Sequence, residues 1–327
     1  MYNIVYFLLF MSEKDENKAP AKKYFFQHLL AAGLAGSITE CLTICFDVTK
    51  CRMMMDRGNP KIYKNLFDCF KKITSQESPF ALFKGLSAGI YRQMIYASLR
   101  IALFDYFVKS IASNPKDPRL IENIVSGIMS GAIGITVANP TDVIKVRMIM
   151  NGQPTYVNGV MTPVERLYKN TLDCFIKSYQ KDGIYKGYWA GWLPNVVRNS
   201  IVNPAELATY FYVKNLFLKH TSMPDNYILH IMCGFLAGFV ASLFGNPIEV
   251  VRTRLMDDKK GEYKRSAFTA FSKILKNEGI FAFYKGWPLF LLRIGTFNTI
   301  VFFVLEKMRD LIVPHFKENR KKKIHNK

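Results

Sequence analysis

The sequence predicts an all-α membrane protein with six transmembrane helices in three tandem repeats of about 100 residues each. Three observations lead to this prediction: a charged motif that occurs three times, six long apolar segments, and ionisable residues at matching positions within those segments. Half of the 327 residues are hydrophobic, which excludes a disordered, collagen-like or low-complexity chain. The six cysteines and five histidines form no disulfide framework and no metal-binding spacing, so we expect no metal and no cofactor.

The repeat is carried by a motif in which an acidic residue is followed by a base three positions later and by a second base after two more. The acidic residues are Asp47, Asp142 and Glu249, which lie 95 and 107 positions apart. A proline precedes the acid by two positions in the second and third copies, and Cys45 takes its place in the first. About 30 residues later a second marker, an aromatic residue, a variable residue and a glycine, ends at Gly85, Gly191 and Gly286. Two markers at matching offsets indicate three copies of one module.

Six long apolar segments flank these markers, one before the first marker and one after the second in each copy. They span residues 25–52, 88–111, 121–149, 190–219, 227–255 and 286–311. Each is long enough to cross a hydrocarbon core of about 30 Å as a helix. Pairs of glycines and other small residues in the odd-numbered segments favour close packing of helices in a membrane, with the core of a soluble protein as the weaker alternative.

The chain is therefore expected to divide into a disordered N-terminal extension, three repeats and a basic tail, at residues 1–24, 25–114, 115–220, 221–312 and 313–327. Either Met1 or Met11 could be the true start. The three long loops within the repeats carry 18 Lys and Arg against 10 acidic residues, which places them on the inner face of the membrane. The basic tail points to the opposite orientation. The net charge of +20 favours a negatively charged partner.

Arginines recur at one depth of the even-numbered segments. Arg92, Arg198 and Arg293 each lie seven positions after the marker glycine of their repeat. Ionisable groups at membrane depth are costly unless they face a protein interior or a water-filled cavity, so they mark a pathway. In a bundle with pseudo-threefold symmetry the three guanidinium groups would converge and form a site for a carboxylate or a phosphate. The alternative, a soluble protein with exposed arginines, is disfavoured because the depth is the same in each repeat.

The first marker predicts a gate. Its acid and its first base lie three positions apart on one helical face, so both can point into the bundle. In a threefold ring each acid can contact the base of a neighbouring helix, which would close one end of the cavity with breakable ion pairs. The residues are Asp47, Lys50, Asp142, Lys145, Glu249 and Arg252.

These motifs resemble the signature of the mitochondrial carrier family, Pro-x-acid-x-x-base-x-base followed by aromatic-base-Gly, and the resemblance covers about residues 25–312. Segments 85–93, 194–203 and 205–210 are similar to the uncoupling proteins and to the oxoglutarate and dicarboxylate carriers, and 189–195 is similar to the brain-type uncoupling proteins. The resemblance implies a pseudo-threefold, multi-pass bundle in the mitochondrial inner membrane that works by alternating access.

The resemblance also implies roles for single residues. The family's substrate contacts fall on the arginine triplet, and Glu206 aligns with an acid tied to nucleotide inhibition in uncoupling proteins. Glu40 aligns with a first-helix acid that is implicated in proton transfer. The gate on the matrix side would pair Asp47 with Lys145, Asp142 with Arg252, and Glu249 with Lys50.

The family's opposite gate, an aromatic-acid-x-x-base motif on the even helices, is incomplete in this sequence. The first copy has Asp105 but Val108 in place of the base, and the second has Phe211 in place of the acid, followed by Lys214. The third copy has Glu306 and Arg309. Of the three possible bridges between repeats, Asp105 with Lys214 alone has both partners, so we predict a weak outer gate.

Two transport functions fit these residues. The first is an uncoupling-protein-like carrier of protons or small anions, and the second is an exchanger of dicarboxylates of the oxoglutarate and malate type. The resemblance implies a small anionic substrate, anionic membrane lipid such as cardiolipin, and purine nucleotides and fatty acids as candidate regulators. A nucleic-acid-binding protein is disfavoured because many bases lie in loops beside acids. An enzyme is disfavoured because no nucleophile with a base, metal cluster or phosphate-binding loop stands out.

Overall fold

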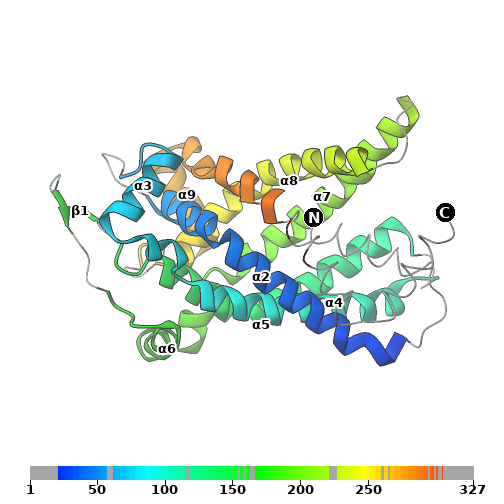
Figure 1. Ribbon diagram of the computed structural model, residues 1–327, viewed down its shortest axis with the longest axis horizontal. Helices are drawn as coiled ribbons and strands as arrows, with labels where there is room; N and C mark the ends of the chain where they lie inside the picture. The colour runs from blue at the N-terminus through cyan, green and yellow to red at the C-terminus, as the bar shows by residue number, and fades with distance from the viewer. Residues whose placement is uncertain are drawn as a thin grey trace.

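Five long helices run along the longest axis of the computed structural model (Figure 1). They are α2 (Ala21–Met55), α4 (Leu86–Ile111), α5 (Leu120–Ile149), α7 (Trp192–His220) and α8 (Tyr227–Met256). The structure describes residues 21–56, 62–114, 118–153, 155–157, 160–162, 166–220, 227–258, 261–263, 266–293, 295–297, 300 and 304. Residues 287–293 and 295–297, within the sixth predicted segment, are also helical. Most of the predicted N-terminal extension and all of the basic tail lie outside the described residues.

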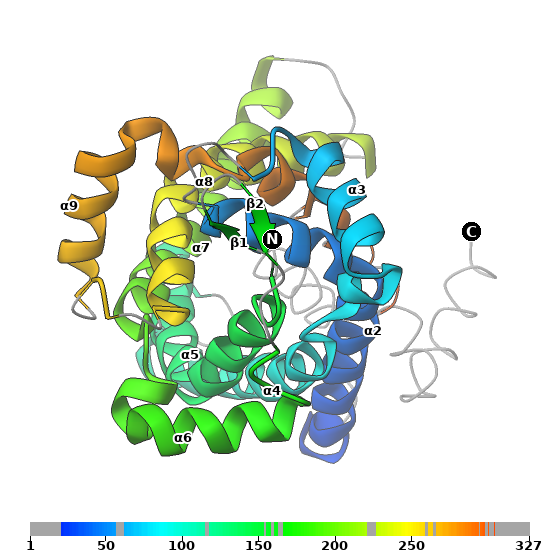
Figure 2. The same ribbon diagram turned by 90° about the vertical axis from the view of Figure 1, so that its left-hand side faces the viewer.

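Short elements gather at one end of the bundle, between the two long helices of each repeat (Figures 1 and 2). They are α3 (Leu66–Gln76), η1 (Pro79–Phe83), α6 (Thr171–Tyr188), α9 (Ala267–Glu278) and η2 (Ile280–Tyr284). In Figure 2 the helices α3, α6 and α9 lie around the rim of the ring formed by the long helices. The threefold arrangement predicted from the repeat is thus visible in the fold.

The second repeat adds a small antiparallel hairpin, β1 (Thr155–Val157) and β2 (Val160–Thr162), that the sequence analysis did not predict. Val157 and Val160 are paired in its register, so two residues connect the strands. The sequence at the connection is Asn158-Gly159, a pair typical of two-residue hairpin turns. The signal was therefore present, within the longest of the three loops.

The three short helices begin in the same way because each has a capping side chain at the same place in its repeat. The side chains of Asn65, Asn170 and Ser266 accept a hydrogen bond from the backbone N–H three residues later. The marker glycines that precede the even helices have positive φ angles of 82°, 68° and 76°. A Cβ atom at Gly85 would lie 3.0 Å from the carbonyl oxygen of Lys145, so this turn also lets two repeats approach closely.

The signature proline is inside the helix in the second and third repeats and is absent from the first. Pro140 lies within α5 and Pro247 within α8. In α2 the equivalent residue is Cys45, and the helix continues for 35 residues. The Thr49 hydroxyl donates to the carbonyl oxygen of Cys45 at 2.8 Å. The first repeat therefore lacks the proline that would break a backbone hydrogen bond at this point.

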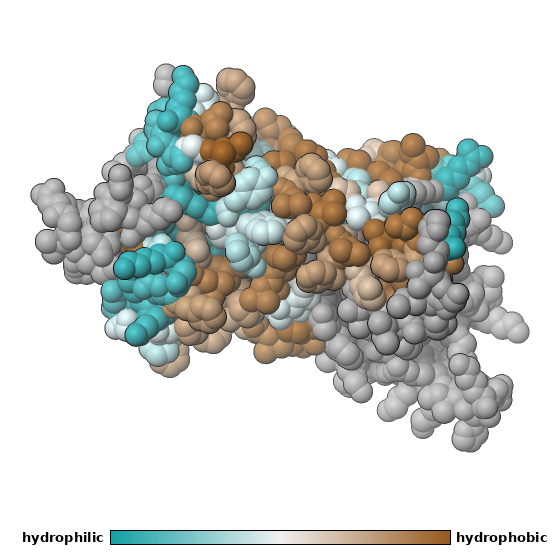
Figure 3. Space-filling view, turned by 90° about the horizontal axis from the view of Figure 1, so that it is seen from above, coloured by the Kyte–Doolittle hydropathy of each residue, from teal (hydrophilic) through white to brown (hydrophobic). Residues whose placement is uncertain are grey.

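The surface and the interior have the polarity expected of a bundle in lipid. Apolar side chains are exposed at every fourth position of two helices, which gives stripes along α2 (Leu30, Leu34, Ile38 and Leu42) and α5 (Ile121, Val125, Met129, Ile133 and Val137). Figure 3 shows apolar side chains over the middle of one face and polar side chains at the end that carries the short helices. The interior instead buries many charged groups, and such groups in a membrane protein face the bundle interior.

Two of the described helices are long and apolar enough to span a membrane by length and composition, Ile121–Ile149 and Met232–Met256. Charged residues on α4 and α7, including Arg92 and Arg198, make those helices less apolar as a whole. Their inward-facing charges belong to the site described next.

Candidate functional site

A ring of ion pairs joins the three repeats near the end that carries the short helices. Lys50 Nζ lies 2.8 Å from Glu249 Oε1, and Arg252 Nη2 lies 2.9 Å from Asp142 Oδ2. Lys145 is paired with Asp47. Each acid thus contacts the first base of another repeat, in the three combinations that the resemblance implies. We call these six residues and the arginine triplet the charge ring.

The three arginines of the triplet are paired with the acids of this ring. They do not form a separate layer of unpaired cations. Arg92 is paired with Asp142 and Arg293 with Asp47, and Arg198 Nε lies 2.9 Å from Glu249 Oε2. Each acid therefore holds a base from an odd helix of one neighbouring repeat and an arginine from an even helix of the other neighbouring repeat. The expected convergence of the three guanidinium groups is present, but in this state they bind the protein's own carboxylates.

The reason for this arrangement is the cyclic order of the repeats. For each acid, the odd-helix base comes from the next repeat around the ring and the arginine comes from the previous one. A carboxylate can accept several charge-assisted hydrogen bonds, so one acid can hold two cations. The equal offset of the arginines from the marker glycines was the signal in the sequence. Their engagement with the gate acids was not anticipated.

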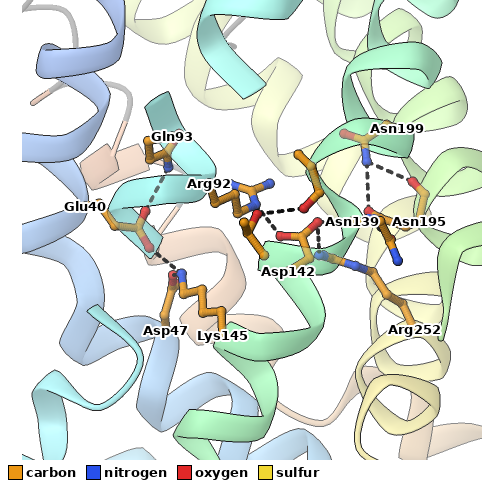
Figure 4. Close-up of polar contacts among 12 residues, drawn as sticks. Glu40, Asp47, Arg92, Gln93, Asn139, Asp142, Lys145, Asn195, Asn199 and Arg252 are labelled. Atoms are coloured by element: carbon orange, nitrogen blue, oxygen red, sulfur yellow. Dashed lines mark hydrogen bonds and ion pairs between the residues drawn. The ribbon is translucent and has the colours of Figure 1, made fainter. Parts of the chain in front are cut away.

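Glu40 adds a fourth carboxylate to the ring (Figure 4). Its side chain is fully buried, is paired with Lys145, and accepts a hydrogen bond from Gln93 Nε2 at 2.8 Å. Arg293 lies 3.9 Å away. Glu40 and Asp47 thus share Lys145. A Cβ atom at Gly89 would lie 2.8 Å from Glu40 Oε1, so this glycine leaves the space that the carboxylate occupies.

Two asparagines support the second acid and were not identified from the sequence (Figure 4). Asn195 Nδ2 donates to Asp142 Oδ2 at 2.9 Å and lies 3.1 Å from Asn139 Oδ1. Asn139 in turn donates to the backbone carbonyl of Tyr188 at 2.7 Å. An asparagine before the signature proline recurs at Asn246, which donates to the carbonyl of Phe283 at 2.6 Å. The recurring Asn-Pro pair was the signal that could have found Asn139.

A second layer of contacts uses the second base of each signature. Arg52, Arg147 and Arg254 are paired with the acids that precede the aromatic markers, Glu77, Asp182 and Glu278. Each arginine also donates to a backbone carbonyl at the end of an odd helix in another repeat, at Ile149, Met256 and Met54 respectively. The arginines thereby link the short helices to the long ones across the seams between repeats.

The marker base adds to this layer in two repeats. Lys84 contacts Glu77 at 2.6 Å and donates to the carbonyl of Asn151. Lys285 contacts Glu278 at 2.7 Å and donates to the carbonyl of Asp56. In the second repeat the equivalent residue is Ala190. The seam between the second and third repeats therefore has no lysine at this position.

Glu278 gives this layer a measurable pH dependence. Burial alone would raise the pKa of Glu278, but hydrogen bonds from Arg254 and Lys285 and their positive charges lower it from 4.5 to about 2. A lowered pKa means that the stabilisation is complete above pH 4.5 and is lost as the pH falls towards 2. We therefore expect E278Q to be less heat-stable than wild type near neutral pH, and the difference in melting temperature to shrink across that acid range. A difference that stays constant down to the acid limit would contradict the assignment.

Of the residues predicted for the outer gate, Asp105 is paired within its own helix. Lys109 Nζ lies 2.5 Å from Asp105 Oδ2 on the same helix, four residues away. Lys109 lies one position beyond the place of the family's base, which Val108 occupies, so the motif does not point to it. Lys214 is partly buried, Glu206 is 4% exposed, and Glu306 and Arg309 lie outside the described residues. The structure thus has the charge ring closed at one end and an acid held within its own helix at the other.

Comparisons with known proteins agree with this architecture. A family model described as "Mitochondrial carrier protein" matches residues 21–115, 116–221 and 224–316. "Putative mitochondrial transporter UCP3" of Bos taurus is 34% identical over 292 residues, which cover 87% of this chain and 91% of that protein. "Mitochondrial uncoupling protein 2" of Arabidopsis thaliana is 34% identical, covering 88% of this chain and 94% of that protein. "Mitochondrial uncoupling protein 1" of the same plant is 34% identical, with 86% and 92% covered.

Proposed function

This chain belongs to the mitochondrial carrier family, and from that premise we propose that it carries protons and small anions across the inner membrane by alternating access. It is an uncoupling-protein-like mitochondrial carrier, and members of this family are transporters. The relatives named above favour this function over the dicarboxylate exchanger that the sequence left open. We place the three repeats in the membrane as a multi-pass bundle, with the short helices on the matrix side.

The closed charge ring is the observation that carries the proposal. It links all three repeats through ion pairs that have to break before the matrix end can open. Counting Glu40, the ring holds six cations and four carboxylates, so a positive charge remains inside the bundle. An anion entering from the opposite end would be attracted to this excess charge. It could then replace the protein's carboxylates on the arginines.

Glu40 supplies the proton-carrying group in this scheme. While Glu40 is ionised, two carboxylates, Glu40 and Asp47, hold Lys145. Protonation would remove one of these two attractions and leave Lys145 to Asp47 alone. Proton uptake at Glu40 would therefore weaken the contact between the first and second repeats, which ties proton movement to opening of the ring. Anionic lipid such as cardiolipin, purine nucleotides and fatty acids remain proposed partners by resemblance to the family.

Transport by the purified protein in liposomes tests the proposal. Proton flux, with and without fatty acid, would be followed in parallel with uptake of labelled malate and oxoglutarate. We expect fatty-acid-dependent proton flux that is lost in variants of the charge ring. Saturable exchange of malate for oxoglutarate without proton flux would instead establish the dicarboxylate exchanger. Absence of both activities in a folded protein would contradict the proposal.

Replacing Glu40 with glutamine is expected to lower proton flux by at least about tenfold, because the side-chain amide cannot take up and release a proton near neutral pH. The protein should remain folded, since glutamine is nearly the same size and can still accept from Lys145. E40D, which keeps a titratable group, should retain more flux than E40Q. E262Q is the matched control, because Glu262 is an exposed acid outside the ring. Equal proton flux in E40Q and wild type would remove Glu40 from the mechanism.

A further inference from the structure

The three corners of the charge ring differ at one equivalent position. The residue four positions after the marker glycine is Gly89 in the first repeat, Asn195 in the second and Phe290 in the third. The Glu40 carboxylate lies against Gly89, and Asn195 donates to Asp142. A carboxylate, an amide and an aromatic ring thus occupy equivalent places beside the three acids, and the first two already have a defined contact.

Phe290 is fully buried and lies against two cations of the ring. Lys50 Nζ is 4.7 Å from the centre of its ring, and the guanidinium carbon of Arg198 is 5.4 Å away. Both distances are within the range of a cation–π interaction. The same two cations are the partners of Glu249, at 2.8 and 2.9 Å. Phe290 therefore contacts both cations that other repeats place on this acid.

The other arginines of the triplet have aromatic contacts of a different kind. Arg92 lies over Tyr96 at 5.4 Å, and Arg293 lies over Phe297 at 5.5 Å. Each of these rings is on the arginine's own helix, four residues later, so the contact stays within one repeat. In α7 the equivalent residue is Val202. Arg198 instead uses a ring from the third repeat, and that ring also contacts Lys50 from the first.

The charge at this corner explains why an aromatic ring is useful. Glu249 is contacted by Lys50, Arg198 and also Arg252, whose Nη1 lies 3.1 Å from Oε2. Arg252 is shared with Asp142, but Lys50 and Arg198 already place two positive charges beside one buried carboxylate. The negative face of an aromatic ring attracts such cations. Unlike a further carboxylate, it adds no negative charge that would compete with an entering anion for them.

We propose that Phe290 is a positioning residue that holds Lys50 and Arg198 on Glu249 through cation–π contacts, and so stabilises the closed ring where all three repeats meet. Its removal would loosen this corner selectively and leave the corners at Asp47 and Asp142 unchanged. The effect on transport rests on the proposed function, whereas the effect on the closed ring can be measured without any transport.

A double-mutant cycle on heat stability tests the contact. F290L keeps an apolar side chain but removes the aromatic ring. It is combined with K50M at the same corner of the charge ring or with K145M at a different corner. We expect the fall in melting temperature caused by F290L to be about halved in the K50M background and unchanged in the K145M background, since coupling is confined to groups in contact. F290Y, which keeps the ring face, should be closer to wild type than F290L.

Phe283 provides the matched control for packing. It is buried in the same repeat, at 3% exposure, and stacks on Phe271 with the ring centres 4.6 Å apart. F283L should lower the melting temperature by the same amount in wild type, K50M and K145M. An F290L effect that is equally large in all three backgrounds would overturn the proposal, because it would show that Phe290 acts through packing alone. F290Y behaving like F290L would overturn it as well.

Transport separates this inference from the proposed function. If the protein carries protons or anions, F290L should raise the maximal rate severalfold with little change in the apparent KM, because the closed ring opens more readily. A slower maximal rate in a folded F290L protein would count against the inference. If wild type transports nothing in the assays above, the proposed function has failed, and the melting-temperature cycle still decides whether Phe290 holds the ring.

Discussion

Replacing Arg198 with alanine should lower transport by the reconstituted protein about 100-fold or more. Arg198 is one of three arginines on the charge ring, and its side chain is 13% exposed and paired with Glu249. Without it, an entering anion loses one of the planar cationic groups suited to carboxylate and phosphate, and the lost charge-assisted contact is about 3 kcal/mol, or roughly 100-fold. Flux of labelled anion and of protons into liposomes measures the loss.

R198K and R166A define the controls for this result. R198K keeps the charge but loses the planar guanidinium group. Activity above that of R198A would show that the charge contributes, and activity below that of wild type would show that the guanidinium geometry contributes. Arg166 is exposed in a loop outside the ring, so R166A should remove the same charge without affecting transport. Wild-type flux in a folded R198A protein would show that the triplet does not contact the transported ion.

Spacing in the sequence was enough to predict the threefold fold and a gate in which each signature acid contacts a base of another repeat, whereas the particular pairs came from the resemblance to the carrier family. The three signature acids recur at near-equal offsets, and helical geometry places each first base on the same face three residues later. The cyclic order of the repeats then leaves few ways to pair them. Lys50 with Glu249, for example, joins residues almost 200 positions apart, and the resemblance to the carrier family implied this pair.

The conformational state of the bundle could not be predicted from spacing. Arg92, Arg198 and Arg293 were placed at one level, but whether they face an open cavity or bind the gate acids depends on which end is closed. The contact of Glu40 with Lys145 depends on the missing side chain at Gly89, on another helix. Phe290 has no counterpart in the other repeats, so a search for recurring residues passes over it.

The contacts of Arg254 predict the largest effect on stability. Its side chain is fully buried, is paired with Glu278, and donates to the carbonyl of Met54 at 3.1 Å. R254M would leave Glu278 with Lys285 alone and remove a link between the third and first repeats. Breaking a buried ion pair by removing one partner costs about 3–5 kcal/mol. For a protein of this size we expect the melting temperature in detergent to fall by about 10 °C.

R147M is the matched change at another seam, and its effect should be smaller. Arg147 contacts Asp182 through one nitrogen at 2.9 Å, its bond to the Met256 carbonyl is longer at 3.4 Å, and its side chain is 8% exposed. Arg254 instead makes two contacts with Glu278, and Lys285 adds a further bond across the same seam. If the seam with more cross-repeat bonds is the more firmly held, R254M must cost more stability than R147M. The reverse order would mean that these bonds do not determine how tightly the repeats are joined, and that the charge ring alone closes the matrix end.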